Sequence, residues 1–370
     1  MGVRAGLVSL AERPGRQHIT GTTGAIMSDI DVRPAEQVRS LLDHRYRPAR
    51  RFRVTSAHIR DFARIVQDSH PAYHDGDAAD ALGFPALIAP PTFASTILLR
   101  VHREILDTLI TGYHPSRILH ADQVLDIGRP IMAGDDIGCD IYFESFRHFA
   151  DYDVMAIKSV LTDQCGQVLQ TGSTALLART GGDIRFAETA PRASAATRTA
   201  AAGSVVAGAG DHIVAVASGR RPRTTVDIGS LSVGAELPRR VLCLSRADLA
   251  AYARITGDTG HGPTEPRAGL GDSVADLPTA VAPGMLTLGV AAGYVTSWLG
   301  DPAAVGRLRA QFAHYTHYMR VCAGESSPIE FSGRITSLDP GRRRGTVAVE
   351  ARSHGRRLFG YAAAEVRFAD

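Results

Sequence analysis

Two loops of the chain carry residue types that suit general acid–base chemistry. The first loop holds four candidates within seven residues: Asp68, His70, Tyr73 and His74. The second loop holds Asp258 and His261. A carboxylate and an imidazole in one loop can bind a hydroxyl group and move a proton at neutral pH. The same patterns also fit polar loops on the surface, so residue type alone leaves both interpretations open.

The two loops belong to an internal duplication of the chain. Each follows a segment with helical periodicity, FARIVQD in the first half and YARITGD in the second, and these segments align without a gap. Asp68 then lies opposite Asp258, 190 residues later (258 − 68), whereas Pro90 lies opposite Pro283, 193 residues later (283 − 90). The second loop is therefore three residues longer than the first.

Each copy is expected to be an α+β unit in which an antiparallel sheet wraps around one long helix. After each loop comes a helical stretch that is apolar around most of its circumference, TFASTILLRVHREIL in the first copy and MLTLGVAAGYVTSWL in the second. Such a helix must be covered on several sides. Each copy ends in segments with alternating apolar and polar residues, separated by turn signals such as DPGRRRG, which is typical of antiparallel strands.

Composition divides the chain into four segments. We expect a loose leader over 1–29, a first copy over 30–180, a linker over 181–227 and a second copy over 228–370. Met27 is a second candidate for the true start of the chain. The linker is rich in Ala, Gly, Ser and Thr, which is typical of a flexible connection, and HIVAVA at 212–217 is its one expected strand.

Several motifs resemble those of hotdog dehydratases. VAPGMLTLGVAAGYVTSWLGDP is similar to the central helix of MaoC-like dehydratases and (R)-specific enoyl hydratases. RFRVTSAHIRDFARIVQDSHP, LGFPALIAPPTF and GRPIMAGD resemble the FAS1-like dehydratase subunit of actinobacteria, the HadA type. In this order the motifs resemble a fused HadA–HadB (3R)-hydroxyacyl-ACP dehydratase. The resemblance implies a double hotdog, in which each long helix is wrapped by a sheet and the two sheets join edge to edge.

The resemblance implies dehydration of a (3R)-hydroxyacyl thioester, on acyl carrier protein or coenzyme A, to the trans-2-enoyl form in fatty-acid or polyketide synthesis. That reaction needs a base, an acid and donors for the thioester oxygen, but no cofactor or metal. The resemblance implies that Asp258 orients the hydroxyl group and that the N–H of Gly284, where the central helix starts, binds the thioester oxygen. The first copy would shape the acyl tunnel, with its own loop as a secondary candidate site.

The second copy departs from the family pattern at two positions. The family has Asp and His five residues apart, but Pro263 stands at the histidine position, and Pro283 replaces the histidine before Gly284. His261, three residues after Asp258, is the best available base. Two interpretations stay open: an active dehydratase with a relocated histidine, and a degenerate acyl-binding protein that assists another dehydratase. A hotdog thioesterase is disfavoured by the same motifs.

Composition argues against several other classes of protein. The 41 Lys and Arg residues nearly balance the 38 Asp and Glu residues, and aromatic residues make up only 6%, so no nucleic-acid partner is expected. The cysteines are scattered, which is typical of reduced thiols: Cys139, Cys165, Cys243 and Cys322. No apolar run is long enough for a membrane span. We therefore expect a cytoplasmic protein without a membrane partner, in which two double hotdogs could form a homodimer.

Overall fold

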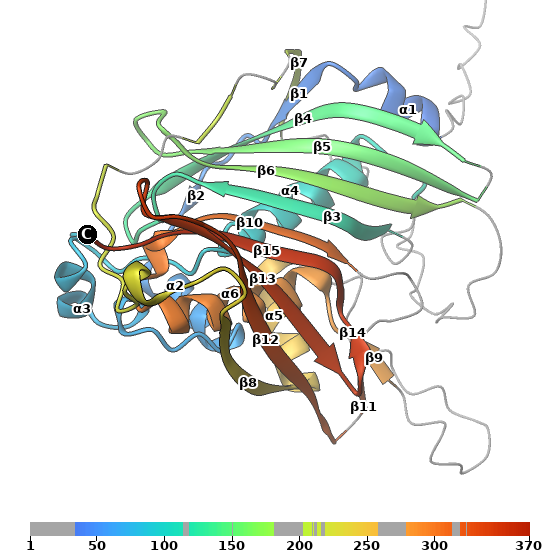
Figure 1. The fold of residues 1–370 in the computed structure, drawn as a ribbon. Helices are drawn as coiled ribbons and strands as arrows, with labels where there is room; N and C mark the ends of the chain where they lie inside the picture. The colour runs from blue at the N-terminus through green and yellow to red at the C-terminus, as the bar shows by residue number, and fades with distance from the viewer. Residues whose placement is uncertain are drawn as a thin grey trace, which may run out of the picture. The chain divides into compact units, whose positions relative to one another are not determined.

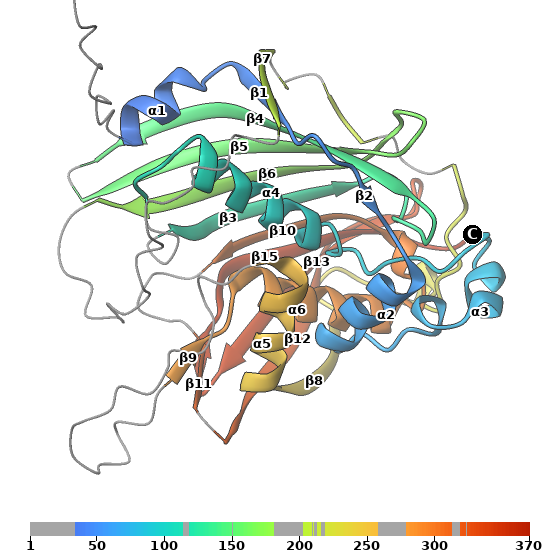
Figure 2. The same ribbon diagram turned by 180° about the vertical axis from the view of Figure 1, so that it is seen from behind.

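In the described part of the computed structural model, 13 strands form one antiparallel sheet, and the long helices lie together on one of its faces (Figures 1 and 2). The order along the sheet is β7-β1-β4-β5-β6-β3-β10-β15-β13-β12-β8, with β2 and β14 paired at the side of this path. The structure describes residues 34–113, 118–149, 151–180, 203–208, 210, 213–215, 219–257, 279–312, 319–322 and 324–370.

The first copy has the helix-then-strands order that its sequence predicts. Its helical elements are α1 (Pro34–Ser40), α2 (Ser56–Ile65), the short 3-10 helix η1 (Pro71–Tyr73), α3 (Gly76–Ala81) and α4 (Ser95–Thr108). Its strands are β1 (His44–Arg47), β2 (Phe52–Arg53), β3 (Ile118–Ile127), β4 (Asp136–His148), β5 (Tyr152–Thr162) and β6 (Val168–Arg179). A capping box between Thr55 and His58 begins α2, and the loop that carries Asp68 follows the other end of this helix.

The second copy repeats this order. Its helical elements are η3 (Ile228–Ser230), α5 (Arg246–Thr256), α6 (Gly284–Leu299) and η6 (Pro302–Ala304). Its strands are β8 (Glu236–Ser245), β9 (Thr279–Val281), β10 (Val305–Phe312), β11 (Arg320–Cys322), β12 (Ser326–Asp339), β13 (Arg344–Ser353), β14 (Arg356–Arg357) and β15 (Phe359–Arg367). Of the 16 residues of α6, 13 are buried. This helix therefore lies in the core of the copy and is not an amphipathic helix with one solvent-exposed face.

The two copies share one sheet through the antiparallel pairing of β3 with β10 (Figure 1). In this pairing Leu125 lies opposite Leu308 and Val124 lies opposite Arg309. Each strand is thus the edge of one half-sheet and is covered by the edge of the other, so neither edge is left with unpaired backbone groups. The fold is a double hotdog, which confirms the expected fold class.

The helices of the two copies also touch, in a contact that we call the inter-copy seam. It consists of Val66, Asp68 and Tyr73 from the first copy and Gly289, Gly293 and Thr296 from α6. A Cβ atom added at Gly289 would lie 2.7 Å from Cγ1 of Val66, and one added at Gly293 would lie 3.1 Å from Cβ of Asp68. The glycines therefore let the backbone of α6 approach the first copy more closely than any other residue would allow.

The linker contributes a strand at a different place from the one predicted. Strand β7 (Ser204–Ala207) pairs with β1 and forms the end of the sheet. The strand expected at 212–217 is wrong for the part that the structure describes, since residues 213–215 are not in a strand. Residues 213–215 pair with no strand of the described structure, whereas β7 covers the free edge of β1. Among the described residues, no helix has both the length and the apolar character to cross a membrane.

Substitution of Gly289 by Ala tests the seam. The added methyl group would overlap the buried, β-branched side chain of Val66, so we expect Gly289→Ala to lower the free energy of unfolding by about 1–3 kcal/mol. Val66→Ala opens the space that the methyl group needs. Chemical denaturation of both single variants and the double variant should therefore give a double variant more stable than the sum of the single effects. Additive effects would contradict the contact.

Candidate functional site

The start of α6 provides free backbone donors in the second copy. Helix α6 begins at Gly284 directly after Pro283, and no side chain caps its first turn. Among the described residues, the N–H of Gly284 has no acceptor, as is usual for the first N–H groups of a helix. A Cβ atom at Gly284 would lie 2.9 Å from the ring of Phe312, so the ring packs directly on this helix start. The N–H groups and the helix dipole together suit an oxygen that gains negative charge.

The two second-copy residues that sequence proposes for acid–base work, Asp258 and His261, lie outside the described residues. Helix α5 ends just before them at Gly257, which caps the helix in the left-handed conformation with a φ of 69°. The structure therefore locates the helix start at Gly284, and the positions of the two loop side chains remain an expectation from sequence.

The first-copy loop is buried in the seam instead of lying on the surface. The Asp68 side chain accepts hydrogen bonds at Oδ2 from the Tyr73 hydroxyl group at 2.9 Å and from the Thr296 hydroxyl group at 2.7 Å. The backbone N–H of His70 donates to Oδ1 at 3.4 Å. Asp68 is only 1% exposed and Tyr73 is fully buried. The interpretation of this segment as a polar surface loop therefore does not hold for Asp68 and Tyr73.

The two histidines of this loop have different surroundings: the His70 ring hydrogen-bonds to backbone groups, and the His74 ring packs against Tyr73. Nδ1 of His70 accepts from the N–H of Ala72 at 3.2 Å, which puts the proton on Nε2, and Nε2 then donates to the carbonyl oxygen of Gly300 at 3.1 Å. Both ring nitrogens of His70 are thus occupied, one of them by the end of α6. The ring of His74 packs against Tyr73, with 6.4 Å between the centroids. The loop joins the copies and offers no free imidazole at His70.

The helix start of the first copy differs from that of the second. Pro90 and Pro91 precede α4, and proline has no N–H to offer to a ligand oxygen. The hollow beside these prolines has a volume of about 10 Å³, enough for no more than one water molecule. At the positions that align with Pro283 and Gly284, the first copy therefore has no N–H to offer to a thioester oxygen.

Burial is the main cause of the shifted pKa values of Asp68 and Tyr73 in the inter-copy seam. Removal from water raises the pKa of Asp68, and the hydrogen bonds from Thr296 and Tyr73 only partly oppose this change. The pKa of Tyr73 is also raised, first by burial and then by the neighbouring Asp68 carboxylate. The hydroxyl group of Tyr73 therefore keeps its proton and remains a donor to Asp68.

Sequence reasoning missed two histidines near the start of α6. His102 lies on α4 and is 8% exposed, and neither of its ring nitrogens has a hydrogen-bond partner in the described structure. Its ring centroid lies 6.4 Å from that of His120 on β3, and the His120 centroid lies 6.5 Å from that of Phe312. No motif links residues on separate elements. The one available signal was a histidine in the middle of an apolar helix, LLRVHREIL.

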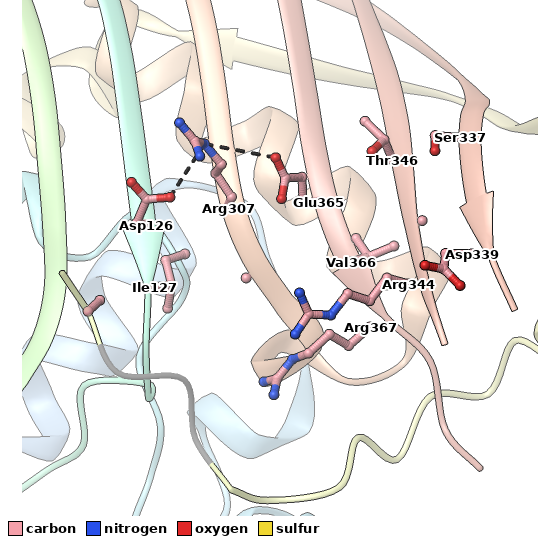
Figure 3. A pocket seen from close by; sticks show the side chains of 13 residues that line it. Asp126, Ile127, Arg307, Ser337, Asp339, Arg344, Thr346, Glu365, Val366 and Arg367 are labelled. Carbon is pink, nitrogen blue, oxygen red and sulfur yellow. Dashed lines mark ion pairs between the residues drawn. The ribbon is translucent and has the colours of Figure 1, made fainter. Parts of the chain in front are cut away.

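A separate hollow of about 240 Å³ lies on the face of the sheet turned away from the helices (Figure 3). In it Arg307 pairs with Asp126 at 3.4 Å and with Glu365 at 3.9 Å, while Arg344 and Arg367 lie side by side. Burial and the nearby charges of Arg220 and Arg344 lower the pKa of Arg367. Because the sheet separates this hollow from α6, we do not assign it to the acyl thioester.

Comparison with known proteins gives dehydratase relatives for the first copy and for the chain as a whole. Residues 41–171 match the family described as the FAS1-like dehydratase domain region. A UPF0336 protein of Streptomyces coelicolor is 36% identical over 141 residues, which cover 38% of this chain and 94% of that protein. A solved structure described as a MaoC-like dehydratase is 31% identical, with a TM-score of 0.73, and the match covers 90% of this chain and 100% of the other.

The double hotdog architecture also has a solved counterpart. A conserved hypothetical protein from Mycobacterium tuberculosis, described as a double hotdog fold, gives a TM-score of 0.60 at 15% identity, over 90% of this chain and 98% of the other. This likeness concerns the fold alone. The more similar relatives define the class: the chain belongs to the MaoC-like dehydratase family, with a FAS1-like dehydratase domain in its first copy.

Asp68→Asn tests the buried carboxyl group of the seam. The folded protein holds the Asp68 proton to a higher pH than the unfolded chain does, because burial raises the pKa. This contribution to stability is complete below the pKa of an unfolded aspartate, about 3.9, and is lost as pH rises through the folded pKa. The stability of the wild type relative to Asp68→Asn should therefore be greater at about pH 5 than at about pH 8.

Thermal unfolding at the two pH values measures this difference directly. Asp61→Asn serves as a control, because the side chain of Asp61 is 51% exposed and pairs with Arg64 on the surface. A difference between wild type and Asp68→Asn that stays constant with pH would contradict the buried-carboxyl interpretation.

Proposed function

We propose that the chain dehydrates a (3R)-hydroxyacyl thioester to the trans-2-enoyl thioester and works as a fused HadA–HadB-type enzyme. The observation that carries this proposal is the uncapped start of α6 at Gly284, which lies in a dehydratase-family fold. A thioester oxygen gains negative charge as the α-proton leaves, and preorganised N–H donors stabilise that charge. The first copy has Pro91 at the position that aligns with Gly284, so of these two aligned positions only Gly284 has an N–H.

The roles follow from what each step requires. A base takes the α-proton, the bond between C3 and its oxygen breaks, and the hydroxyl group leaves as water with a proton from an acid. We assign His261 as the base and Asp258 as the group that orients the hydroxyl. The N–H of Gly284 binds the thioester oxygen, and the first copy shapes the acyl tunnel. Acyl carrier protein or coenzyme A would carry the substrate.

A second candidate is a degenerate acyl-binding protein that assists a separate dehydratase. Two observations favour it: Pro263 and Pro283 stand where the family has histidines, and the Asp68 loop is occupied by seam contacts. The first candidate predicts catalytic turnover of the thioester, whereas the second predicts binding without turnover. Purified protein that binds an acyl thioester but neither hydrates trans-2-enoyl-CoA nor dehydrates a 3-hydroxyacyl thioester would support the second candidate.

Two substitutions at Gly284 isolate its N–H group. Ala and Pro both place a Cβ near Phe312, so they share the steric cost, but only Pro removes the N–H. Proline is tolerated at the first position of a helix, and Pro283 already has the extended ψ of 138° that a following proline requires. We expect Gly284→Pro to lower kcat in enoyl-CoA hydration about 100-fold more than Gly284→Ala does. Equal losses in the two variants would show that this N–H is not used.

A further inference from the structure

We propose that His102 is a recognition site for a hydroxyl group on the acyl chain, placed by the first copy next to the working helix start of the second. This inference rests on the proposed function, because it requires an acyl thioester at the start of α6. It deepens that function by naming the kind of chain that the protein prefers: a chain that carries a hydroxyl group beyond C3 rather than a plain hydrocarbon one.

The first argument is that both nitrogens of His102 lack a partner although the ring is buried. The ring is 8% exposed, and no described residue forms a hydrogen bond with either nitrogen. Leaving buried polar groups unpaired costs free energy, and leucine or phenylalanine could fill this part of α4 without that cost. A ligand that supplies the missing partners would offset it.

The second argument concerns the chemistry of the ring. Burial, and after it the neighbouring His120, lower the pKa of His102 to about 3, so the ring is neutral at physiological pH. A neutral imidazole has one N–H donor and one acceptor nitrogen, and a hydroxyl group likewise donates once and accepts. A carboxylate or phosphate would match the acceptor nitrogen poorly. The neutral ring therefore fits a hydroxyl group better than it fits an anion.

The third argument is position. Phe312 packs on Gly284, His120 follows at 6.5 Å from Phe312, and His102 follows at 6.4 Å from His120, measured between ring centroids. A continuous row of rings thus leads from the thioester-binding helix start to the unpartnered nitrogens on α4. An acyl chain that starts at Gly284 and enters the first copy would run along this row. In the proposed reaction Asp258 orients the C3 hydroxyl group, so the hydroxyl group that His102 meets lies farther along the chain.

The experiment compares the binding of three coenzyme A thioesters by calorimetry: octanoyl, (3R)-3-hydroxyoctanoyl and 5-hydroxyoctanoyl. We expect wild type to bind the 5-hydroxyoctanoyl thioester about tenfold more tightly than octanoyl, as for a site that pairs a substrate hydroxyl group. The (3R)-3-hydroxyoctanoyl thioester reports on the proposed function instead, because Asp258 orients its hydroxyl group there. His102→Phe should bind octanoyl at least as well as wild type and lose the preference, without a decrease in the Tm of the free protein.

His354→Asn is the matched control, because His354 lies in an exposed turn between β13 and β14 and its φ of 49° is tolerated by asparagine. It should keep the preference of wild type. If His102→Phe fails to fold, His102→Gln retains a donor and an acceptor and should keep part of the preference, whereas His102→Leu should lose it. The same preference in wild type and in the apolar variants would overturn the inference, and so would octanoyl binding with no preference in wild type. Absence of binding for all three thioesters, together with absence of turnover, would instead overturn the proposed function.

Discussion

The close contact of α6 with the first copy is the constraint on which the rest of the structure depends. A helix with 13 of 16 residues buried cannot be covered by its own sheet alone, so part of its surface must face another element. Gly289 and Gly293 let the first copy fill that role at backbone distance, and Asp68 and Thr296 join the two sides by a buried hydrogen bond. The pairing of β3 with β10 connects the two copies a second time, within the sheet.

This constraint explains why two similar loops have different surroundings. In the first copy, the aspartate accepts two hydroxyl donors, and the tyrosine at the family's histidine position supplies one of them. The loop thereby stabilises the seam, and Pro91 has no N–H at the position that aligns with Gly284. In the second copy, the helix start keeps its N–H groups. Duplication of one fold has thus produced one copy that holds the structure together and one that retains the chemistry we propose.

Much of the fold could be predicted from sequence, because it depends on local periodicity and on repeated motifs. The segments SAHIRDFARIVQD and SRADLAAYARITGD contain α2 and α5, and the alternating segments after each central helix contain β4, β5, β6, β12, β13 and β15. The strand predicted at 212–217 is absent from its described part, residues 213–215, because alternation alone does not say whether a free sheet edge lies nearby. A double hotdog followed from the duplication and the motifs together.

The site was harder to predict because its parts come from distant segments. The role of Gly284 could be expected from the motif before the central helix, but the burial of Asp68 depends on Thr296, 228 residues later in the chain. His102 on α4 and His120 on β3 come close only in the folded chain, since they are 18 residues apart (120 − 102) on separate elements. Sequence spacing can locate a loop that carries titratable groups. Tertiary packing decides whether that loop connects the two copies or takes part in an active site.

The most direct measurement is a crystal structure of the full chain with a bound, non-hydrolysable analogue of a 3-hydroxyacyl thioester. The account predicts one bound analogue per chain, with its carbonyl oxygen at the N–H of Gly284 and nothing at Pro90 and Pro91. An analogue bound instead at the start of α4, with the Asp68 loop opened to receive it, would contradict the division of roles between the two copies.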